Sequence, residues 1–555
     1  MTNIILTLLS QRRLDEHYQA GHWRNDTIYS LVRGHASVNP ERVAVRDRSG
    51  VITYKQLIAR SDALASRLSQ AGLRQGDRVA VWLSSRIETA IALVACSRSG
   101  FVCCPSLHRD HTVGDIIELM NRMRAAAFIG EIGYGADAAR KDIFASEAEV
   151  PSLKVIFALG AAGSAAGGTL PEAAEADYDE AINLDPNIAV YLAFTSGTTG
   201  RPKGVMHSDN TLLANARAMI ADWRFDTQSV VYTMSPLSHN LGLGSLIMAL
   251  AAGAELVVHD LARGASTLDR IIEVGATFIV GVPTHAMDLL NEMKARKMSS
   301  PGSVRGFRIS GASAPREVIA ELLLTGVVPQ SGYGMTEAGS HHYTRIDDGA
   351  DRVVQTSGRA CDGYEVKIFS KDDVNQELPV GITGQIGGRG ASLMLGYFDD
   401  QGANDDAFNS DGWFMTGDIG RLDQDGYLQI TGRKKDLIIR GGHNIYPARI
   451  ENLAMQHPAI ARAAALPVPD LRLGEKVCLA VMLRPGHSVA PDDVLEHLDR
   501  SGLSRYDMPE YYLSLDDIPL TASGKILKRD IAVQIADGKV TPQAIRFVPS
   551  QTRAG

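Results

Sequence analysis

The sequence Thr195-Ser196-Gly197-Thr198-Thr199-Gly200-Arg201-Pro202-Lys203-Gly204 separates two segments of regular structure. The apolar run 188–194 before it predicts a buried strand, and Ser208 after it is placed to cap a helix with apolar residues at three- and four-residue spacing. Glycines let backbone N–H groups face an anion, hydroxyls add donors, and Lys203 adds a positive charge. The loop therefore predicts a polyphosphate site. It is not a common P-loop, because Pro202 precedes the lysine.

On both sides of this loop, short apolar segments alternate with helical patterns. The segments expected to form strands are 43–45, 77–83, 101–104, 230–234, 255–259 and 278–282. Such alternation predicts a layered α/β architecture with a largely parallel sheet. Residues 157–176 are crowded with alanine and glycine and predict a surface excursion between elements.

The last part of the chain has a different residue pattern. From Gly384 the sequence is β-rich with Gly and Asp at turns, and the charged cluster Gly432–Asp436 precedes a new strand at 437–440. We therefore expect an N-terminal domain over 1–432 and a small α+β C-terminal domain over 433–555, a length typical of one domain.

Composition narrows the class of protein. The chain has 555 residues, 45% of them hydrophobic, and a net charge of −8, which argues against a nucleic-acid binder. Its five cysteines lack metal-ligand spacing and suit a reducing cytoplasm. The apolar residues 1–10 are too short to span a bilayer and predict a docking arm or short helix. We expect a soluble, cytoplasmic protein without a transmembrane segment.

Further motifs follow the loop in order: Gly311–Pro315, Tyr333–Glu337, Thr416–Asp418, Gly432-Arg433 and Pro519–Lys525. Together they resemble the adenylate-forming superfamily, which contains acyl-CoA synthetases, aryl-acid adenylating enzymes, peptide-synthetase adenylation domains and luciferases. The resemblance implies a large N-terminal domain of layered α/β subdomains with a β-rich subdomain, and a small mobile α+β C-terminal domain. It also implies ATP, Mg²⁺ and coenzyme A as ligands.

The residue types suit an attack of a carboxylate on the α-phosphorus of ATP. Tyr333 offers a flat face to a base, the Thr336 hydroxyl reaches the α-phosphate, and Glu337 is a hard-oxygen ligand for Mg²⁺. Asp418 can accept hydrogen bonds from both ribose hydroxyls. By the resemblance, Arg433 also reaches the ribose.

Lys525 is expected to bridge the substrate carboxylate and the α-phosphate, two anions that must approach each other. The catalytic residues that the resemblance implies are Lys525, His239, Thr336, Glu337 and Arg433. The residues that it assigns to ATP or AMP are Thr195, Ser196, Gly197, Thr198, Thr199, Lys203, Gly311, Ala312, Ser313, Ser331, Gly332, Tyr333, Gly334, Met335, Thr336, Asp418, Ile430, Arg433 and Lys525. Those that it assigns to the acyl pocket are His239, Asn240, Val282, Gly311, Gly334 and Met335.

The resemblance also implies that the C-terminal domain alternates between an adenylation pose and a thiolation pose. The hinge falls on Lys435, and Gly441, Gly442 and His443 come to the site for thioester formation with coenzyme A. His443 stands where related acyl-CoA ligases more often have glutamate.

Three functions are compatible with these motifs. Residues 432–451 and 21–26 look most like short- and medium-chain or alicyclic acyl-CoA ligases, which predicts a small carboxylic acid as substrate. His239-Asn240 also resembles aryl-acid adenylating enzymes, which load a carrier protein; coenzyme A is favoured because no carrier domain is fused. A catalytically dead nucleotide sensor is disfavoured because Glu337 and Lys525 are present. The acid and the oligomeric state, a homodimer included, are left open.

Overall fold

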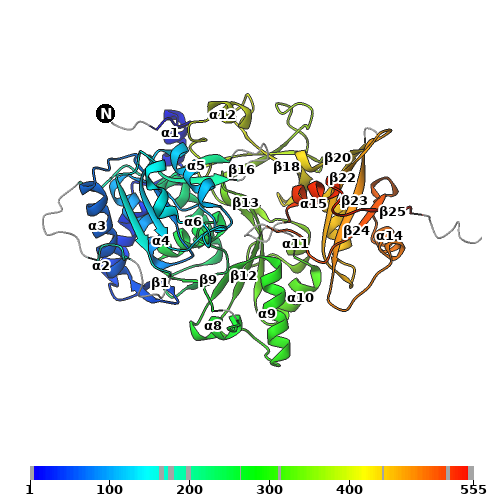
Figure 1. Cartoon of the computed structure of the whole chain (residues 1–555), viewed down its shortest axis with the longest axis horizontal. Coiled ribbons are helices and arrows are strands. Elements are labelled where there is room, and N and C mark those ends of the chain that lie inside the picture. The colour runs from blue at the N-terminus through cyan, green and yellow to red at the C-terminus, as the bar shows by residue number, and fades with distance from the viewer. Residues whose placement is uncertain are drawn as a thin grey trace, which may run out of the picture. The chain divides into compact units, whose positions relative to one another are not determined.

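The computed structural model describes residues 5–161, 168–172, 181–195, 202–262, 264–310, 314–440, 443–520 and 526–547. The chain, coloured from blue to red in Figure 1, forms two compact units. Unit 1 comprises Met1–Glu365 and Gly388–Phe408, and unit 2 comprises Val366–Gly387 and Asn409–Gly555. The expected division at 432/433 and the hinge at Lys435 stay predictions.

The first sheet of unit 1 has the strand order β15-β14-β13-β12-β11-β9-β10-β1-β2. Its strands are β1 (Val43–Asp47), β2 (Gly50–Thr53), β9 (Val230–Thr233), β10 (Glu255–Val258), β11 (Phe278–Gly281), β12 (Gly306–Ser310), β13 (Val328–Met335), β14 (Gly339–Tyr343) and β15 (Arg359–Ala360). The strands from β13 to β1 in this order pair in parallel, whereas the β1–β2, β13–β14 and β14–β15 pairs are antiparallel. The prediction of a largely parallel sheet is confirmed.

The second sheet of unit 1 has the order β6-β5-β3-β4-β7-β8. Its strands are β3 (Arg78–Trp82), β4 (Val102–Cys104), β5 (Ala125–Glu131), β6 (Val155–Leu159), β7 (Ala189–Thr195) and β8 (Lys203–Ser208). All neighbours pair in parallel except β8, which is antiparallel to β7. Because β6 extends to Leu159, the expected excursion over 157–176 begins too early by three residues.

Strand β8 corrects the prediction that the phosphate loop leads directly into a helix. Ser208 does cap helix α6 (Asp209–Trp223), as expected, through a capping box with Thr211. The segment before it, however, pairs with β7 in a register that joins Thr195 to Lys203. Val205 and Met206 are buried by this pairing. The loop therefore connects the two strands of a hairpin, and its residues 196–201 lie outside the described part of the chain.

Helices fill the space between and outside the two sheets of unit 1. They are α1 (Gln11–Gln19), α2 (Ile28–Val38), α3 (Tyr54–Gln70), α4 (Ile87–Ser99), α5 (Val113–Met123), the 3₁₀ helix η1 (Ile143–Glu149), α6, α7 (Asn240–Ala252), α8 (Thr267–Glu273), α9 (Pro283–Ala295), α10 (Arg316–Leu324), α11 (Ala350–Gln355) and α12 (Gln401–Ala407). Helices α4 and α6 contact strands of both sheets, whereas α9 and α10 pack on the outer face of the first sheet (Figure 1). Helix α4 is accordingly buried almost all round, as its apolar sequence predicts. The layered α/β fold is confirmed.

Unit 2 is built on two further sheets. The first has the order β16-β17-β18-β19, with β16 (Tyr364–Phe369), β17 (Gly384–Gly390), β18 (Phe414–Leu422) and β19 (Leu428–Arg433). The chain passes between the units within β16 and again within β17. The second sheet has the order β21-β20-β23-β24-β25 with β22 also paired to β23, and consists of β20 (Ile438–Arg440), β21 (His443–Ile445), β22 (Ile460–Asp470), β23 (Gly474–Leu483), β24 (Tyr511–Ser514) and β25 (Gln543–Ala544).

The helices of unit 2 are η2 (Lys434–Asp436), α13 (Pro447–Ala454), α14 (Pro491–Arg500), η3 (Arg505–Asp507) and α15 (Lys528–Ala536). Helices α13 and α14 share an apolar core with β22 and β23, and α15 joins a second core on that sheet. Among the described segments of the whole chain, no helix is both long and apolar enough to cross a membrane.

The N-terminal arm, residues 5–26, docks onto unit 1. The guanidinium of Arg13 donates to the carbonyl oxygens of Leu393 and Met394, and the indole N–H of Trp23 donates to the carbonyl of Ala391 at 2.9 Å. Burial lowers the pKa of Arg13 to about 10, so its charge is retained at neutral pH. The arm thereby satisfies three carbonyl groups of a segment far along the chain.

A buried carboxylate begins helix α6. One oxygen of Asp209 accepts hydrogen bonds from the Ile28 N–H at 3.0 Å and from the Ser97 hydroxyl at 2.9 Å. The other is buried without a partner among the described residues. Burial raises the pKa of Asp209 to about 7, so the folded protein binds a proton there that an unfolded chain releases near pH 4.

This linkage gives the first prediction. Because the folded-state pKa is raised, the contribution of Asp209 to stability is complete below about pH 4 and is lost as pH rises through 7, by at most about 4 kcal/mol. Asp209→Asn keeps an accepting oxygen without the charge, so its urea midpoint should exceed that of the wild type at pH 8 but not at pH 4. The exposed Asp516→Asn is the control. Equal shifts at both pH values would contradict the assignment.

Candidate active site

Most of the predicted acyl-pocket residues lie at one edge of the first sheet. The parallel strands β9, β11, β12 and β13 end at the same edge, which is where ligands bind in open α/β sheets. Val282 follows β11 and caps α9, and Gly334 and Met335 end β13. Gly311, which follows β12, lies outside the described residues together with Ala312 and Ser313.

His239 and Asn240 begin helix α7 at this edge. His239 caps the helix, with Nδ1 accepting from the Leu241 N–H at 3.4 Å, and the Asn240 amide donates to the Met335 carbonyl at 3.3 Å. The structure therefore joins the His239-Asn240 pair to the end of β13.

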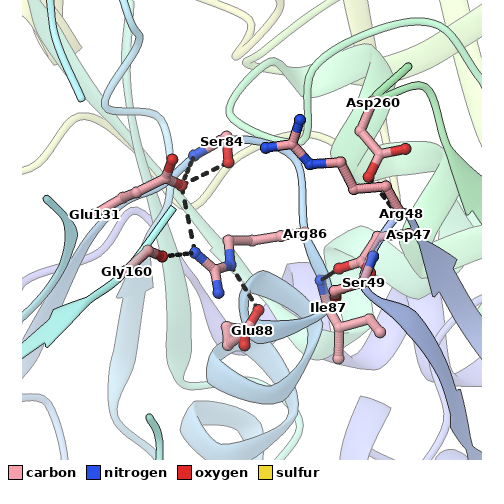
Figure 2. A network of polar contacts seen from close by, with 10 residues as sticks. All are labelled: Asp47, Arg48, Ser49, Ser84, Arg86, Ile87, Glu88, Glu131, Gly160 and Asp260. Carbon is pink, nitrogen blue, oxygen red and sulfur yellow. Dashed lines mark hydrogen bonds and ion pairs between the residues drawn. The ribbon is translucent and has the colours of Figure 1, made fainter. Parts of the chain in front are cut away.

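A polar network holds the loop that precedes His239. Figure 2 shows Asp47, at the end of β1, accepting from the Ile87 N–H at 3.0 Å, so that it caps α4. In the same network Arg86 donates to Glu88 at 2.7 Å and to the Gly160 carbonyl at 2.7 Å. The neighbouring Ser85 hydroxyl accepts from the Leu237 N–H at 3.0 Å. The start of α4 thus supports the His239 loop, a link that no motif indicated.

The imidazole of His108 also faces this loop. Its Nδ1 lies 3.1 Å from the Ser238 hydroxyl, and its ring centre lies 6.2 Å from that of His239. Burial lowers the pKa of His108 to about 4, so the ring is neutral at physiological pH. Sequence reasoning missed His108 because only the fold brings it beside Ser238.

The Tyr333–Glu337 motif forms the end of β13 and the turn after it. A Cβ on Gly334 would lie 2.2 Å from the Gly339 carbonyl oxygen, so only glycine fits at this close approach of β13 and β14. Nε2 of His207 donates to the Thr336 carbonyl at 2.7 Å. Upstream in β13, Ser331 and Gly332 pair with β12, so their backbone supports the motif.

Glu337 and Lys203 both contact Tyr397. The Tyr397 hydroxyl donates to Glu337 Oε1 at 3.0 Å, and Lys203 Nζ lies 4.7 Å from the centre of the Tyr397 ring. Burial and the adjacent Glu337 raise the pKa of Tyr397, so the phenol stays protonated and acts as the donor. Two of the charged groups predicted to face ATP are therefore gathered around one aromatic side chain.

The donor set around Glu337 fits magnesium. The described residues contain no group of three or more His, Cys, Asp and Glu side chains that could enclose a metal ion. A single carboxylate suits Mg²⁺, which is usually held by one or two carboxylates together with substrate phosphates and water. Glu337 and the phosphates of ATP would hold the ion.

In unit 2, the two predicted ribose-binding residues are cross-strand neighbours. Asp418 of β18 pairs with Arg433 of β19, and Arg433 Nε lies 3.1 Å from Asp418 Oδ1. The Asp418 side chain is nearly buried whereas that of Arg433 is half exposed. Ile430, also on β19, lies opposite Gly420 with 36% of its surface exposed.

The remaining predicted residues of unit 2 are those that the resemblance assigns to the thiolation step. Lys435 is an exposed residue in the 3₁₀ turn η2, directly after β19. Nε2 of His443 lies 2.9 Å from Asp507 Oδ1, a contact that the sequence did not reveal. Ser196, Gly197, Thr198, Thr199, Gly441, Gly442 and Lys525 lie outside the described residues.

The fold and this set of residues define an ATP-dependent, adenylate-forming acid–thiol ligase of the acyl-CoA ligase type. The chain belongs to the family of AMP-binding enzymes, whose model matches residues 32–398; the model of the AMP-binding enzyme C-terminal domain matches residues 449–525. The resemblance inferred from the motifs is confirmed.

Individual relatives align over nearly the whole chain. A medium-chain fatty-acid–CoA ligase of Escherichia coli is 31% identical over 95% of this chain and 93% of its own length. A Streptomyces salicylyl-CoA synthase / salicylate adenylyltransferase is 31% identical over 93% of this chain and 95% of its own. The crystal structure of ATP-bound MatB from Rhodopseudomonas palustris is 27% identical, covers 92% of this chain and 99% of its own, and gives a TM-score of 0.79.

Proposed function

We propose that the chain activates a medium-chain, alicyclic or aromatic carboxylic acid and transfers it to coenzyme A. The acid and ATP give an acyl-adenylate and pyrophosphate, and the thiol of coenzyme A then gives acyl-CoA and AMP. The observation that carries the proposal is the gathering of Lys203 and Glu337 around Tyr397, beside the edge where Asn240 meets Met335. The names of the relatives support this range of acids.

Each polar side chain of the candidate site has a role in the proposed reaction. Lys203 neutralises phosphate charge, and Asp418 with Arg433 holds the ribose. Glu337 and the phosphates would hold Mg²⁺, which would supply positive charge to the departing pyrophosphate. His239 lies at the mouth of the acyl pocket, where it orients the acid or the thiol. Lys525 bridges the carboxylate and the α-phosphate during adenylation.

A panel of carboxylic acids assayed for pyrophosphate release tests the choice of acid. CoA-dependent release of AMP tests the acceptor. The alternative acceptor is the phosphopantetheine of a separate carrier protein, for which the Streptomyces relative's second name is the supporting observation. Pyrophosphate release that stays independent of coenzyme A, together with acylation of an added aryl carrier protein, would favour that alternative.

The second prediction concerns the metal. Glu337→Gln keeps the shape of the side chain and removes its charge, so the magnesium concentration for half-maximal ATP–pyrophosphate exchange should rise by about tenfold or more. Glu321→Gln, which removes an exposed carboxylate paired with Lys294, is the matched control and should leave this concentration unchanged. An unaltered magnesium requirement in Glu337→Gln would refute the assignment.

We also propose a cytoplasmic location, supported by the five cysteines, each of which is a buried free thiol. The homodimer stays a prediction, and light scattering of the purified chain tests it.

A further inference from the structure

We propose that Tyr397 is a positioning residue that holds the phosphate-loop lysine and the metal-binding carboxylate in place for ATP. This inference rests on the roles proposed above for Lys203 and Glu337. Tyr397 lies outside every motif that the sequence singles out, in the segment that returns to unit 1 after β17.

Tyr397 contacts the two charged residues with different parts of its side chain. The hydroxyl donates to Glu337 Oε1 at 3.0 Å, which is a hydrogen bond to an ionised acceptor. The ring accepts the Lys203 ammonium over its face, with Nζ 4.7 Å from the centroid, within the range of a cation–π interaction. One side chain therefore contacts a positive and a negative group at once.

The backbone of Tyr397 is fixed on both sides. Its N–H donates to the Asn404 side-chain oxygen at 2.8 Å, and its carbonyl accepts from the Asn404 amide at 3.2 Å. The next residue, Phe398, donates its N–H to the Gly204 carbonyl at 2.7 Å, directly beside Lys203. Tyr397 itself is 5% exposed. The backbone at Tyr397 is thus anchored to strand β8, which carries the lysine.

Glu337 is anchored by the same segment. The Met394 N–H donates to the Glu337 carbonyl at 2.7 Å, three residues before Tyr397. The segment 394–398 thus contacts the turn that carries the carboxylate and the strand that carries the lysine. A ring face stabilises an ammonium without neutralising it, and a hydroxyl donates to a carboxylate without neutralising it, so the contacts with Tyr397 leave both charges in place.

The test separates the hydroxyl from the ring. Tyr397→Phe removes only the donor to Glu337, and Tyr397→Met removes the donor and the aromatic face while nearly filling the space. Tyr54→Phe is the matched control, because it removes another buried phenol, which donates to the Ala254 carbonyl at 2.8 Å, just before β10. Thermal unfolding of each variant checks the fold.

Two measurements are made on each variant. One is the magnesium dependence of ATP–pyrophosphate exchange, and the other is calorimetric binding of a non-hydrolysable ATP analogue at low and at saturating magnesium. Tyr397→Phe should raise the magnesium concentration for half-maximal exchange by about threefold to tenfold, as for loss of one hydrogen bond, and weaken analogue binding only at low magnesium. Tyr397→Met should in addition weaken binding by about threefold or more at saturating magnesium. Tyr54→Phe should change neither quantity.

A double variant distinguishes failure of the inference from failure of the proposed roles. If Tyr397 acts through Glu337, adding Tyr397→Phe to Glu337→Gln should not raise the magnesium requirement further. Glu337→Gln with a wild-type magnesium requirement would overturn the proposed metal site. A shifted requirement in Glu337→Gln but a wild-type one in Tyr397→Phe would overturn the role of Tyr397. Weaker binding of the analogue to Tyr397→Phe at saturating magnesium would show that the hydroxyl acts beyond the carboxylate, which also contradicts it.

Discussion

Lys525→Ala should lower the rate of acid adenylation by a few orders of magnitude and largely spare thioester formation from a presynthesised acyl-adenylate. The lysine is expected to neutralise two anions as they approach each other, and the loss of several kcal/mol of charge stabilisation corresponds to such factors. The two half-reactions are measured separately, by pyrophosphate exchange and by CoA-dependent release of AMP from the adenylate.

The described residues before and after 521–525 contact each other. Leu520 and Ile526 are joined as a β-bridge, and the Leu527 N–H donates to the Pro519 carbonyl at 2.8 Å. The described residues on both sides of 521–525 are therefore paired with each other, and replacement of Lys525 should leave this pairing intact. Lys539→Ala, which removes an exposed lysine of the same unit, is the control and should leave both rates unchanged. A parallel fall of both half-reactions in Lys525→Ala would refute the role.

Lys435→Pro should abolish most transfer to coenzyme A while ATP–pyrophosphate exchange persists. A hinge residue must adopt different φ and ψ angles in the two poses, whereas proline fixes φ near −65° and restricts the preceding residue. Lys435 lies in a 3₁₀ turn, whose φ angles proline can adopt, so the substitution should hold one pose rather than unfold the unit. We expect the adenylation pose to survive, because the exposed hinge side chain takes no part in phosphate chemistry.

Lys435→Ala is the control for this experiment and should be nearly silent, since the backbone and not the charge is at issue. The measurement is the ratio of the rate of acyl-CoA formation to the rate of pyrophosphate exchange, which should fall by orders of magnitude in the proline variant alone. Formation of acyl-CoA by Lys435→Pro at the normal rate would exclude rotation at this position.

Much of the fold follows from local patterns. The apolar segment 101–104 predicted a strand and forms β4, and Ser208 was correctly placed as the cap of α6. Strand β8 was missed because it begins with the polar Lys203 and the weak strand former Gly204. Its buried pairing with β7 outweighs that local preference, and such a tertiary effect does not appear in the sequence pattern.

The candidate site likewise contains residues that the sequence indicated and residues that only the structure revealed. The residues that we expect to contact the nucleotide occur in short motifs, so Glu337 and the Asp418–Arg433 pair could be proposed from the sequence. Tyr397 and His108 have roles that depend on which distant segment folds against them, and a single sequence carries no signal for that. The contact of His443 with Asp507 likewise depends on the fold, since it joins β21 to the turn η3.

The docking of the N-terminal arm has a consequence for synthesis on the ribosome. Arg13 is separated from its acceptor Met394 by 381 positions, and Trp23 from Ala391 by 368. At translation rates of roughly 5–20 residues per second, the arm is made roughly 20–75 s before its binding surface exists. During that interval its apolar residues Leu8, Leu9 and Leu14 are available to nascent-chain chaperones, so the arm is among the last segments to reach its final place.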